Sequence, residues 1–209
     1  GDGAAGSITT GEQNVAIGQG ALGTCSTGKV NTCIGRSAGN ALTTAHFNTF
    51  VGGDSGRVCT TGASNTALGN DTLYDLTTGS NNVCIGGGGF GSVNGAGANI
   101  TTGGDNTLVG GQNCGLNITT QSANTFIGKS AGNNNTASDN TYIGHRCAES
   151  ATTGTNNVCI GKESAPTTNT SNNQFVMGNS NTDNLRCNDT SIASLSDQRD
   201  KIEIVDLPV

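Results

Sequence analysis

Residues 31–39 read NTCIGRSAG and residues 124–132 read NTFIGKSAG, so the chain contains almost the same nine-residue segment twice. The shared core is Asn, two variable residues, an aliphatic residue and Gly. A fixed period in this range is typical of a solenoid, in which each copy is one turn that stacks on its neighbours. The pattern starts nine times, the first five starts being 17 residues apart, and a degenerate tenth copy begins at Gln174: Asn14, Asn31, Asn48, Asn65, Asn82, Asn106, Asn124, Asn140 and Asn157.

The residue after each Asn is always Thr or Val, and this β-branched choice favours a strand over a helix. We therefore predict an all-β fold, a parallel β-solenoid or β-roll of about ten 17-residue turns. Stacked turns about 4.8 Å apart would make a rod roughly 50 Å long.

Both faces of the predicted strand are apolar. The β-branched residue and the aliphatic residue two places later share one face, which we assign to the core. The residue between them, for example Cys33, Phe50 or Tyr142, points the other way and is also apolar. A strand that is apolar on both sides must be covered on both, so we expect self-association around a symmetry axis, as a homotrimer.

The conserved polar and small positions of the repeat have structural roles in this interpretation. We expect the leading Asn residues to form a ladder of amide hydrogen bonds. We expect a Gly where the backbone takes positive φ or passes close to another chain. These closing glycines are Gly18, Gly35, Gly52, Gly69, Gly86, Gly110, Gly128, Gly144 and Gly161.

Composition excludes several classes of protein. Only 32% of the 209 residues are hydrophobic, and there are five Phe, two Tyr and no Trp, which argues against a conventional globular core. The net charge of −6 and the lack of a basic stretch argue against a nucleic-acid partner. No apolar run reaches the roughly 20 residues that cross a bilayer, so we expect no membrane insertion. We expect no cofactor and no metal.

The repeat units resemble the head repeats of trimeric autotransporter adhesins. NVAIGQGA, NTCIGRSA and NTFIGKSA carry the resemblance, which covers about residues 11–180. It implies a left-handed parallel β-roll in a three-chain assembly.

A second resemblance lies in SDQRDKIEI, residues 196–204. This stretch is similar to the start of the intramolecular chaperone domain of phage tail fibres, tail spikes and endosialidases, in which Ser-Asp-x-Arg-x-Lys-x-x-Ile recurs. The resemblance implies that the chaperone cuts itself off between Ser196 and Asp197, with Ser196 as nucleophile and Lys201 as activating base. An amine of lowered pKa is a chemically sensible base for a hydroxyl nucleophile.

The remaining candidates have plain interpretations. We expect Cys33, Cys84 and Cys159 to be small buried hydrophobes, with disulfides across a symmetry axis as the alternative. Cys114, Cys147 and Cys187 lack metal-ligand spacing. His46 and His145 are expected at the surface. An insertion near residues 87–105 interrupts the period and is expected to protrude, and protruding loops often carry binding.

The domain organisation follows from these features. We expect a connection over residues 1–10, the repeat region over 11–180, a second connection over 181–196, and a chaperone stub over 197–209 in a piece of a longer protein.

The leading hypothesis is a fibre segment of a phage or virus, on the virion surface, that binds a host glycan or protein receptor. Its only expected chemistry is a single self-cleavage. One alternative is a bacterial trimeric surface adhesin on the cell surface. Another is an ice-binding solenoid, suggested by the Thr column, although we assign that face to the core. Paired acids at matching offsets are missing, which argues against a glycan-degrading tail spike.

Overall fold

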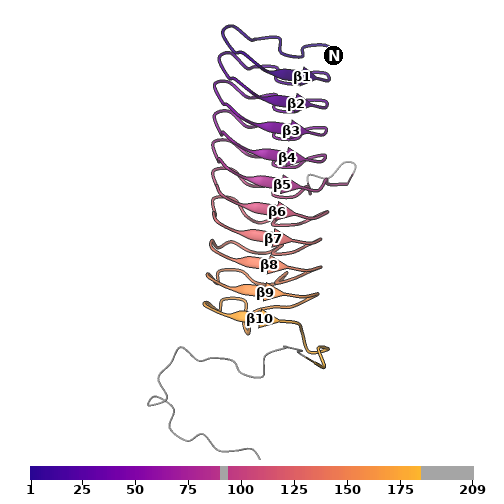
Figure 1. Ribbon diagram of the computed structural model, residues 1–209, viewed down its shortest axis with the longest axis vertical. Helices are drawn as coiled ribbons and strands as arrows, with labels where there is room; N and C mark the ends of the chain where they lie inside the picture. The colour runs from indigo at the N-terminus through magenta and orange to yellow at the C-terminus, as the bar shows by residue number, and fades with distance from the viewer. Residues whose placement is uncertain (90–93, 185–209) are drawn as a thin grey trace, which may run out of the picture.

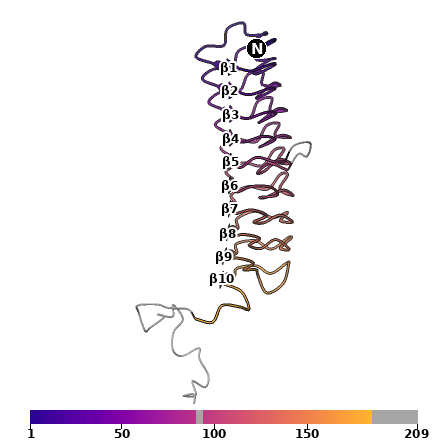
Figure 2. The ribbon, with the colours of Figure 1, turned by 90° about the vertical axis from the view of Figure 1, so that its right-hand side faces the viewer.

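The structure is a computed structural model that describes residues 1–89 and 94–184. Ten short strands stack into one parallel sheet in chain order, and the described residues contain no helix (Figure 1). Seen from the side, the turns form a straight stack (Figure 2). The strands are β1 Val15–Ile17, β2 Thr32–Ile34, β3 Thr49–Val51, β4 Thr66–Leu68, β5 Val83–Ile85, β6 Thr107–Val109, β7 Thr125–Ile127, β8 Thr141–Ile143, β9 Val158–Ile160 and β10 Phe175–Met177.

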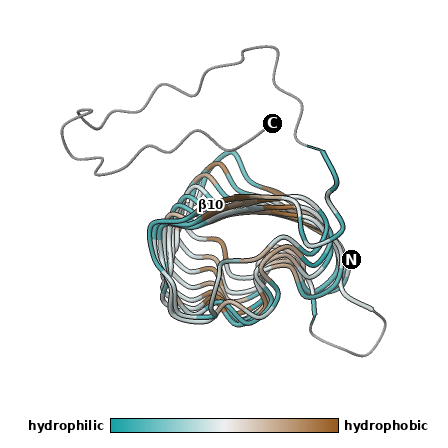
Figure 3. Cartoon of the chain, turned by 90° about the horizontal axis from the view of Figure 1, so that it is seen from below, coloured by the Kyte–Doolittle hydropathy of each residue, from teal (hydrophilic) through white to brown (hydrophobic). Residues whose placement is uncertain are grey.

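The predicted solenoid is confirmed, with about nine turns linking the ten strands. Every neighbouring pair of strands is parallel and in register, so each repeat position stacks on its equivalent in the next turn. In the end view the strands line one side of a narrow closed coil (Figure 3).

The predicted Asn ladder is confirmed. In the buried part of the stack, the Oδ1 of Asn48 accepts hydrogen bonds from the backbone N and the Nδ2 of Asn65, at 3.0 and 3.1 Å. The Nδ2 of Asn48 in turn donates to the Oδ1 of Asn31 and to the backbone oxygen of Gly62. The bond from the backbone N to the preceding Oδ1 repeats along the stack, whereas the bond between side-chain amides stops at Asn124. Each ladder amide thereby satisfies backbone groups of its own turn and of the next.

The assignment of the two strand faces was wrong. The middle residue of each strand points into the coil, and Cys33, Phe50 and Tyr142 are fully buried. The β-branched and aliphatic positions point outward and are half-buried or exposed. The cause is the ladder itself: a buried Asn immediately before the strand puts the first and third strand residues outside, since successive side chains alternate.

Core packing matches large residues to small ones within a turn. Phe50 faces Gly56, where an added Cβ would lie 2.5 Å from the ring. At the equivalent positions of the next turn stand Ala67 and Leu73, which are both fully buried. The same exchange pairs Ala16 with Leu22 and Phe126 with Gly132. The coil therefore keeps a nearly constant girth although its strand residues range from Ala to Tyr.

The closing glycines have the predicted positive φ, with Gly110 as the exception. Gly35 has a φ of 134°, and a Cβ there would lie 2.3 Å from the backbone oxygen of Gly52 in the next turn. Only Gly fits both the dihedral angle and the close approach of consecutive turns.

The insertion is shorter than predicted. Asn82 and Asn106 are 24 positions apart, seven more than the regular step, but Ala96 and Ile100 are buried in the core. The backbone N of Leu73 donates to the oxygen of Ala96, as in the regular turns. Residues 95–105 therefore belong to the turn before β6, because their apolar side chains fill the same core positions as in other copies.

Candidate functional site

The outward side of the sheet is a uniform surface that extends along the whole stack. We call it the strand face; it consists of the first and third residue of each strand. None of its members is charged. They are Val15, Ile17, Thr32, Ile34, Thr49, Val51, Thr66, Leu68, Val83, Ile85, Thr107, Val109, Thr125, Ile127, Thr141, Ile143, Val158, Ile160, Phe175 and Met177.

The strand face exposes apolar side chains along the whole stack. Ile17 is 56% exposed, Leu68 47% and Phe175 64%. Because the strands are in register, the face carries one column of Thr and Val that ends in Phe175, beside one column of Ile, Leu, Val and Met. Brown, hydrophobic strands line that side of the coil in Figure 3. A long, uncharged, partly apolar face of this kind is typical of a surface that binds another surface.

A second ladder, of Thr hydroxyls, runs along the part of the coil behind the strands. The Oγ1 of Thr43 donates to the backbone oxygen of Thr60 at 3.1 Å, and the Oγ1 of Thr60 donates to the oxygen of Thr77 at 3.2 Å. Sequence reasoning treated these positions only as turn residues. The recurring Thr-Thr and Ser-Thr dipeptides were the available signal.

One charged cluster spans the second to fourth turns. The Asp54 carboxylate, which is mostly buried, pairs with Arg36 and with Arg57, whose Nε lies 3.6 Å from Oδ1. The Arg57 guanidinium lies 5.5 Å above the Tyr74 ring and donates to its hydroxyl. Burial raises the pKa of the Asp71 carboxyl, and the Asp54 charge raises it further. Since the two arginines already pair with groups of this chain, the cluster joins turns and does not present a free charge to a ligand.

The cysteines of the described residues are buried and free, as predicted for Cys33, Cys84 and Cys159. Burial raises the pKa of the Cys33 and Cys59 thiols to about 12. A thiol that stays protonated at neutral pH is a poor nucleophile and a poor metal ligand. Cys187 lies outside the described residues. The cysteines therefore serve as core packing.

The isolated histidines show no catalytic arrangement. His46 is half-buried, and its Nδ1 accepts a hydrogen bond from the Lys29 backbone N at 3.0 Å. His145 is exposed. Within residues 1–89 and 94–184, no group of three or more His, Cys, Asp or Glu side chains could hold a metal ion. The same residues include no helix that is long and apolar enough to cross a membrane.

The predicted cleavage residues Ser196, Asp197 and Lys201 lie outside the described residues. No family model, no curated protein and no solved structure matches the chain. The strand face is therefore the feature from which a function is best argued.

Two exposed apolar residues beside the strand face were not singled out from the sequence. Val30 is 41% exposed and Phe47 is 61% exposed. Each precedes a ladder Asn and has a positive φ, 58° and 62°. The signal was available, because in most other copies this position is polar or charged.

Proposed function

We propose that this chain is a segment of a homotrimeric fibre of a phage or virus, which serves attachment to a host surface. The strand face carries the proposal. Twenty uncharged positions along the stack leave apolar side chains in water, and two further copies around an axis parallel to the stack would cover them. In this assembly the rear of each coil faces outward and is available to a receptor.

The resemblance of residues 196–204 to a self-cleaving chaperone supports the viral setting. Cleavage between Ser196 and Asp197 would release the chaperone after three chains have assembled. The Ser196 hydroxyl attacks the carbonyl of the Ser196–Asp197 bond, and Lys201 takes the hydroxyl proton and passes it to the departing Asp197 amine. Water then hydrolyses the resulting ester, so that the chain ends at Ser196.

The experiment is intact mass, native and denatured, of protein expressed from the full-length gene. We expect a trimer whose chains end at Ser196, together with the released downstream piece. Ser196→Ala should give uncut chains. A monomer would contradict the trimer, and a trimer with uncut wild-type chains would contradict the cleavage while leaving the assembly intact.

Substitution on the strand face tests the interface separately. Ile34→Asp and Ile127→Asp each put a charge on the face, at β2 and β7, which we expect to give monomers with unchanged β-sheet circular dichroism. Thr120→Asp adds the same charge at an exposed position outside the strand face and should leave the trimer intact. Equal trimer content in all three variants would contradict the role of the face.

An ice-binding solenoid is the second candidate, favoured by one observation. Because the strand face points outward, its Thr side chains at β2, β3, β4, β6, β7 and β8 form an in-register, solvent-facing column. Ice binding needs this face free, whereas the trimer covers it. Thermal hysteresis of a monomeric preparation would favour the second candidate; its absence at millimolar protein would exclude it.

A further inference from the structure

The strand face alone is small for a stable interface. Ten strands about 4.8 Å apart, each about 10 Å long, give a projected area of roughly 430 Å². A standard interface buries about 800 Å² on each partner. An assembly of these chains therefore needs contacts from the borders of the face as well.

The two borders of the strand face differ in chemistry. We call the residue before each ladder Asn the amino margin: Gln13, Val30, Phe47, Ser64, Asn81, Asp105, Ala123, Asp139, Asn156 and Asn173. We call the residue after each closing Gly the carboxyl margin: Gln19, Arg36, Gly53, Asn70, Gly87, Gly111, Lys129, His145 and Lys162. The amino margin contains acids and no base, whereas the carboxyl margin contains bases and no acid.

The charges of the two margins are concentrated in the same half of the stack. Asp105 and Asp139 are exposed on the amino margin beside β6 and β8. Lys129, His145 and Lys162 are exposed on the carboxyl margin beside β7, β8 and β9. Among the described residues, neither Lys129 nor Asp139 forms a salt bridge within the chain. The Lys162 Nζ forms a long ion pair with the Glu163 Oε1, at 3.8 Å, and the Lys162 side chain remains 69% exposed.

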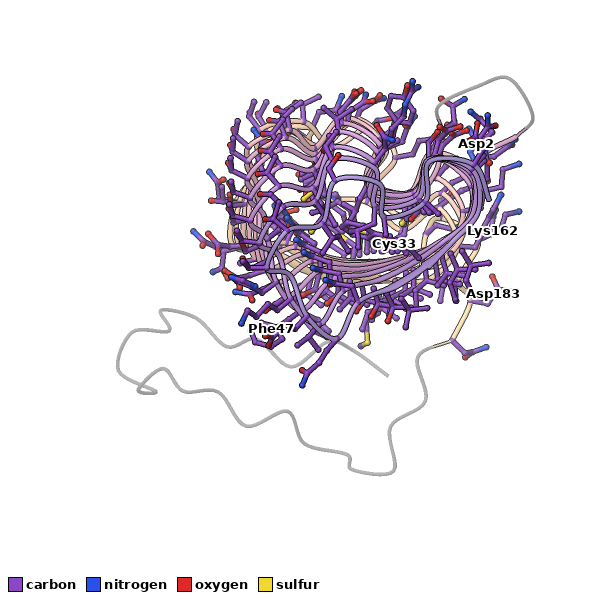
Figure 4. The ribbon with its side chains drawn as sticks, turned by 90° about the horizontal axis from the view of Figure 1, so that it is seen from above. Asp2, Cys33, Phe47, Lys162 and Asp183 are labelled. Atoms are coloured by element: carbon purple, nitrogen blue, oxygen red, sulfur yellow. The ribbon has the colours of Figure 1, made fainter. Side chains whose placement is uncertain are left out.

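In the other half the margins differ in size. Phe47 protrudes from the amino margin beside β3, and Gly53 on the carboxyl margin of the same strand has no side chain. Figure 4 shows Phe47 at one end of the strand layer and Lys162 at the other, with Cys33 inside the coil. The two margins therefore lie on opposite sides of the face.

We propose that copies of this chain pack head to tail in a closed ring, with the amino margin of each copy against the carboxyl margin of the next. The inference rests on the proposed trimer and adds its mode of contact. A cyclic assembly of three copies is heterologous, so two different borders must meet at each interface. Rotation about an axis parallel to the stack keeps every residue at its own height.

This geometry fixes the pairs that meet. Phe47 of one copy lies against Gly53 of the next, beside β3 in both. Asp139 faces His145, with Lys129 one turn above and Lys162 one turn below. Charge complementarity of this kind sets register and discriminates against the reverse orientation, in which acid would meet acid and base would meet base.

Cross-linking tests the contact. In a background of Cys187→Ser, the variant Phe47→Cys/Gly53→Cys should give covalent trimers with a short bismaleimide, because the seven described native thiols are buried. Gly53 lacks a positive φ, and the nearest atom to an added Cβ is the far end of the exposed Asn70 side chain, so the site accepts a side chain once that amide shifts. Each single variant is a control, and Phe47→Cys/Asn117→Cys places the second thiol at an exposed site behind the strands.

Charge reversal tests the other half. Asp139→Lys should weaken the trimer by about tenfold at low salt and less at high salt. Adding Lys129→Glu and Lys162→Glu to the same chain should restore it. Asp75→Lys makes the same charge change on the rear, between the buried Leu73 and Leu76, and should have no effect.

The outcomes separate the two proposals. A native trimer in which the Phe47/Gly53 variant cross-links no better than the single variants overturns the head-to-tail ring and leaves the proposed fibre standing. Covalent dimers from Phe47→Cys alone would indicate two-fold packing and overturn it as well. A chain that stays monomeric overturns both.

Discussion

The size matching between Phe50 and Gly56 gives a quantitative prediction about the core. Phe50 is fully buried, so Phe50→Ala should destabilise the protein by about 3–5 kcal/mol through lost burial and the cavity left behind. Gly56→Leu alone should cost at least about 3 kcal/mol, because its Cβ would already lie 2.5 Å from the Phe50 ring.

The double variant Phe50→Ala/Gly56→Leu recreates the pairing that Ala67 and Leu73 already use. Gly56 has a φ of 57°, and Leu73 has a φ of 52° at the equivalent position, so this backbone demonstrably accepts Leu. We expect the double variant to lie within about 2 kcal/mol of the wild type. Because the two single losses sum to at least about 6 kcal/mol, the coupling between the two sites is at least about 4 kcal/mol.

The assay is urea unfolding at fixed protein concentration, followed by circular dichroism for the wild type, both single variants and the double variant. Phe126 and Gly132 supply an independent repeat of the cycle. If the stability losses of the two single variants simply add in the double variant, in both cycles, then a large residue at one position does not compensate for a small residue at the other. That result would refute the size matching.

Three further predictions follow from the ladder, the thiols and the repeat. Asn65→Ala should cost about 2–5 kcal/mol in urea unfolding, because the Asn82 backbone N and the Gly79 oxygen lose buried partners, whereas Asn117→Ala at the surface should cost under about 1 kcal/mol. Burial raises the pKa of the Cys33, Cys59, Cys114 and Cys147 thiols from 9.0 to about 12, so the unfolded state releases these protons first; stability should be fully present below pH 9 and fall as pH rises toward 12. Melting temperatures from pH 8 to 11 would show this, and a Cys33→Ala/Cys59→Ala variant should lose less; equal slopes would contradict it. Deleting residues 48–64 removes one whole turn and should leave a folded solenoid about 4.8 Å shorter by small-angle scattering; loss of the sheet signal would count against independent stacking of turns.

Much of the fold could be predicted because one short pattern fixed both period and register. The β-branched residue after each Asn placed nine strands correctly, and the degenerate copy from Gln174 placed the tenth. The Asn ladder was expected from the same column. The sequence analysis did not predict correctly which strand residues point into the core, although the ladder implied it. If Asn48 is inside, then Thr49 is outside and Phe50 is inside. The opposite choice was made because the first and third strand residues, β-branched and aliphatic, resemble an ordinary core face.

Other features needed distances. Phe50 and Gly56 are six residues apart, as are Ala67 and Leu73 in the next turn. Only the contact between Phe50 and the Gly56 position shows that these two positions share one space in the core. The insertion was overestimated although the sequence held the signal: Ala96, Gly97, Thr101 and Thr102 lie as far before Asn106 as Ala38, Gly39, Thr43 and Thr44 lie before Asn48. The sequence analysis expected an exposed apolar strand face, but assigned it to the wrong side of the strand.

The direction of the Asn ladder has a mechanical consequence. Hydrogen bonds between turns run along the stack, from the N–H groups of Asn65 to the Oδ1 of Asn48 and so on from turn to turn. Tension applied between the two ends therefore acts on these bonds in series and opens the outermost turn first. Each opened turn of 17 residues releases about 55 Å of extended chain. A stack of this kind lengthens in regular steps under a pull and absorbs work at each one, while the unopened turns keep their shape.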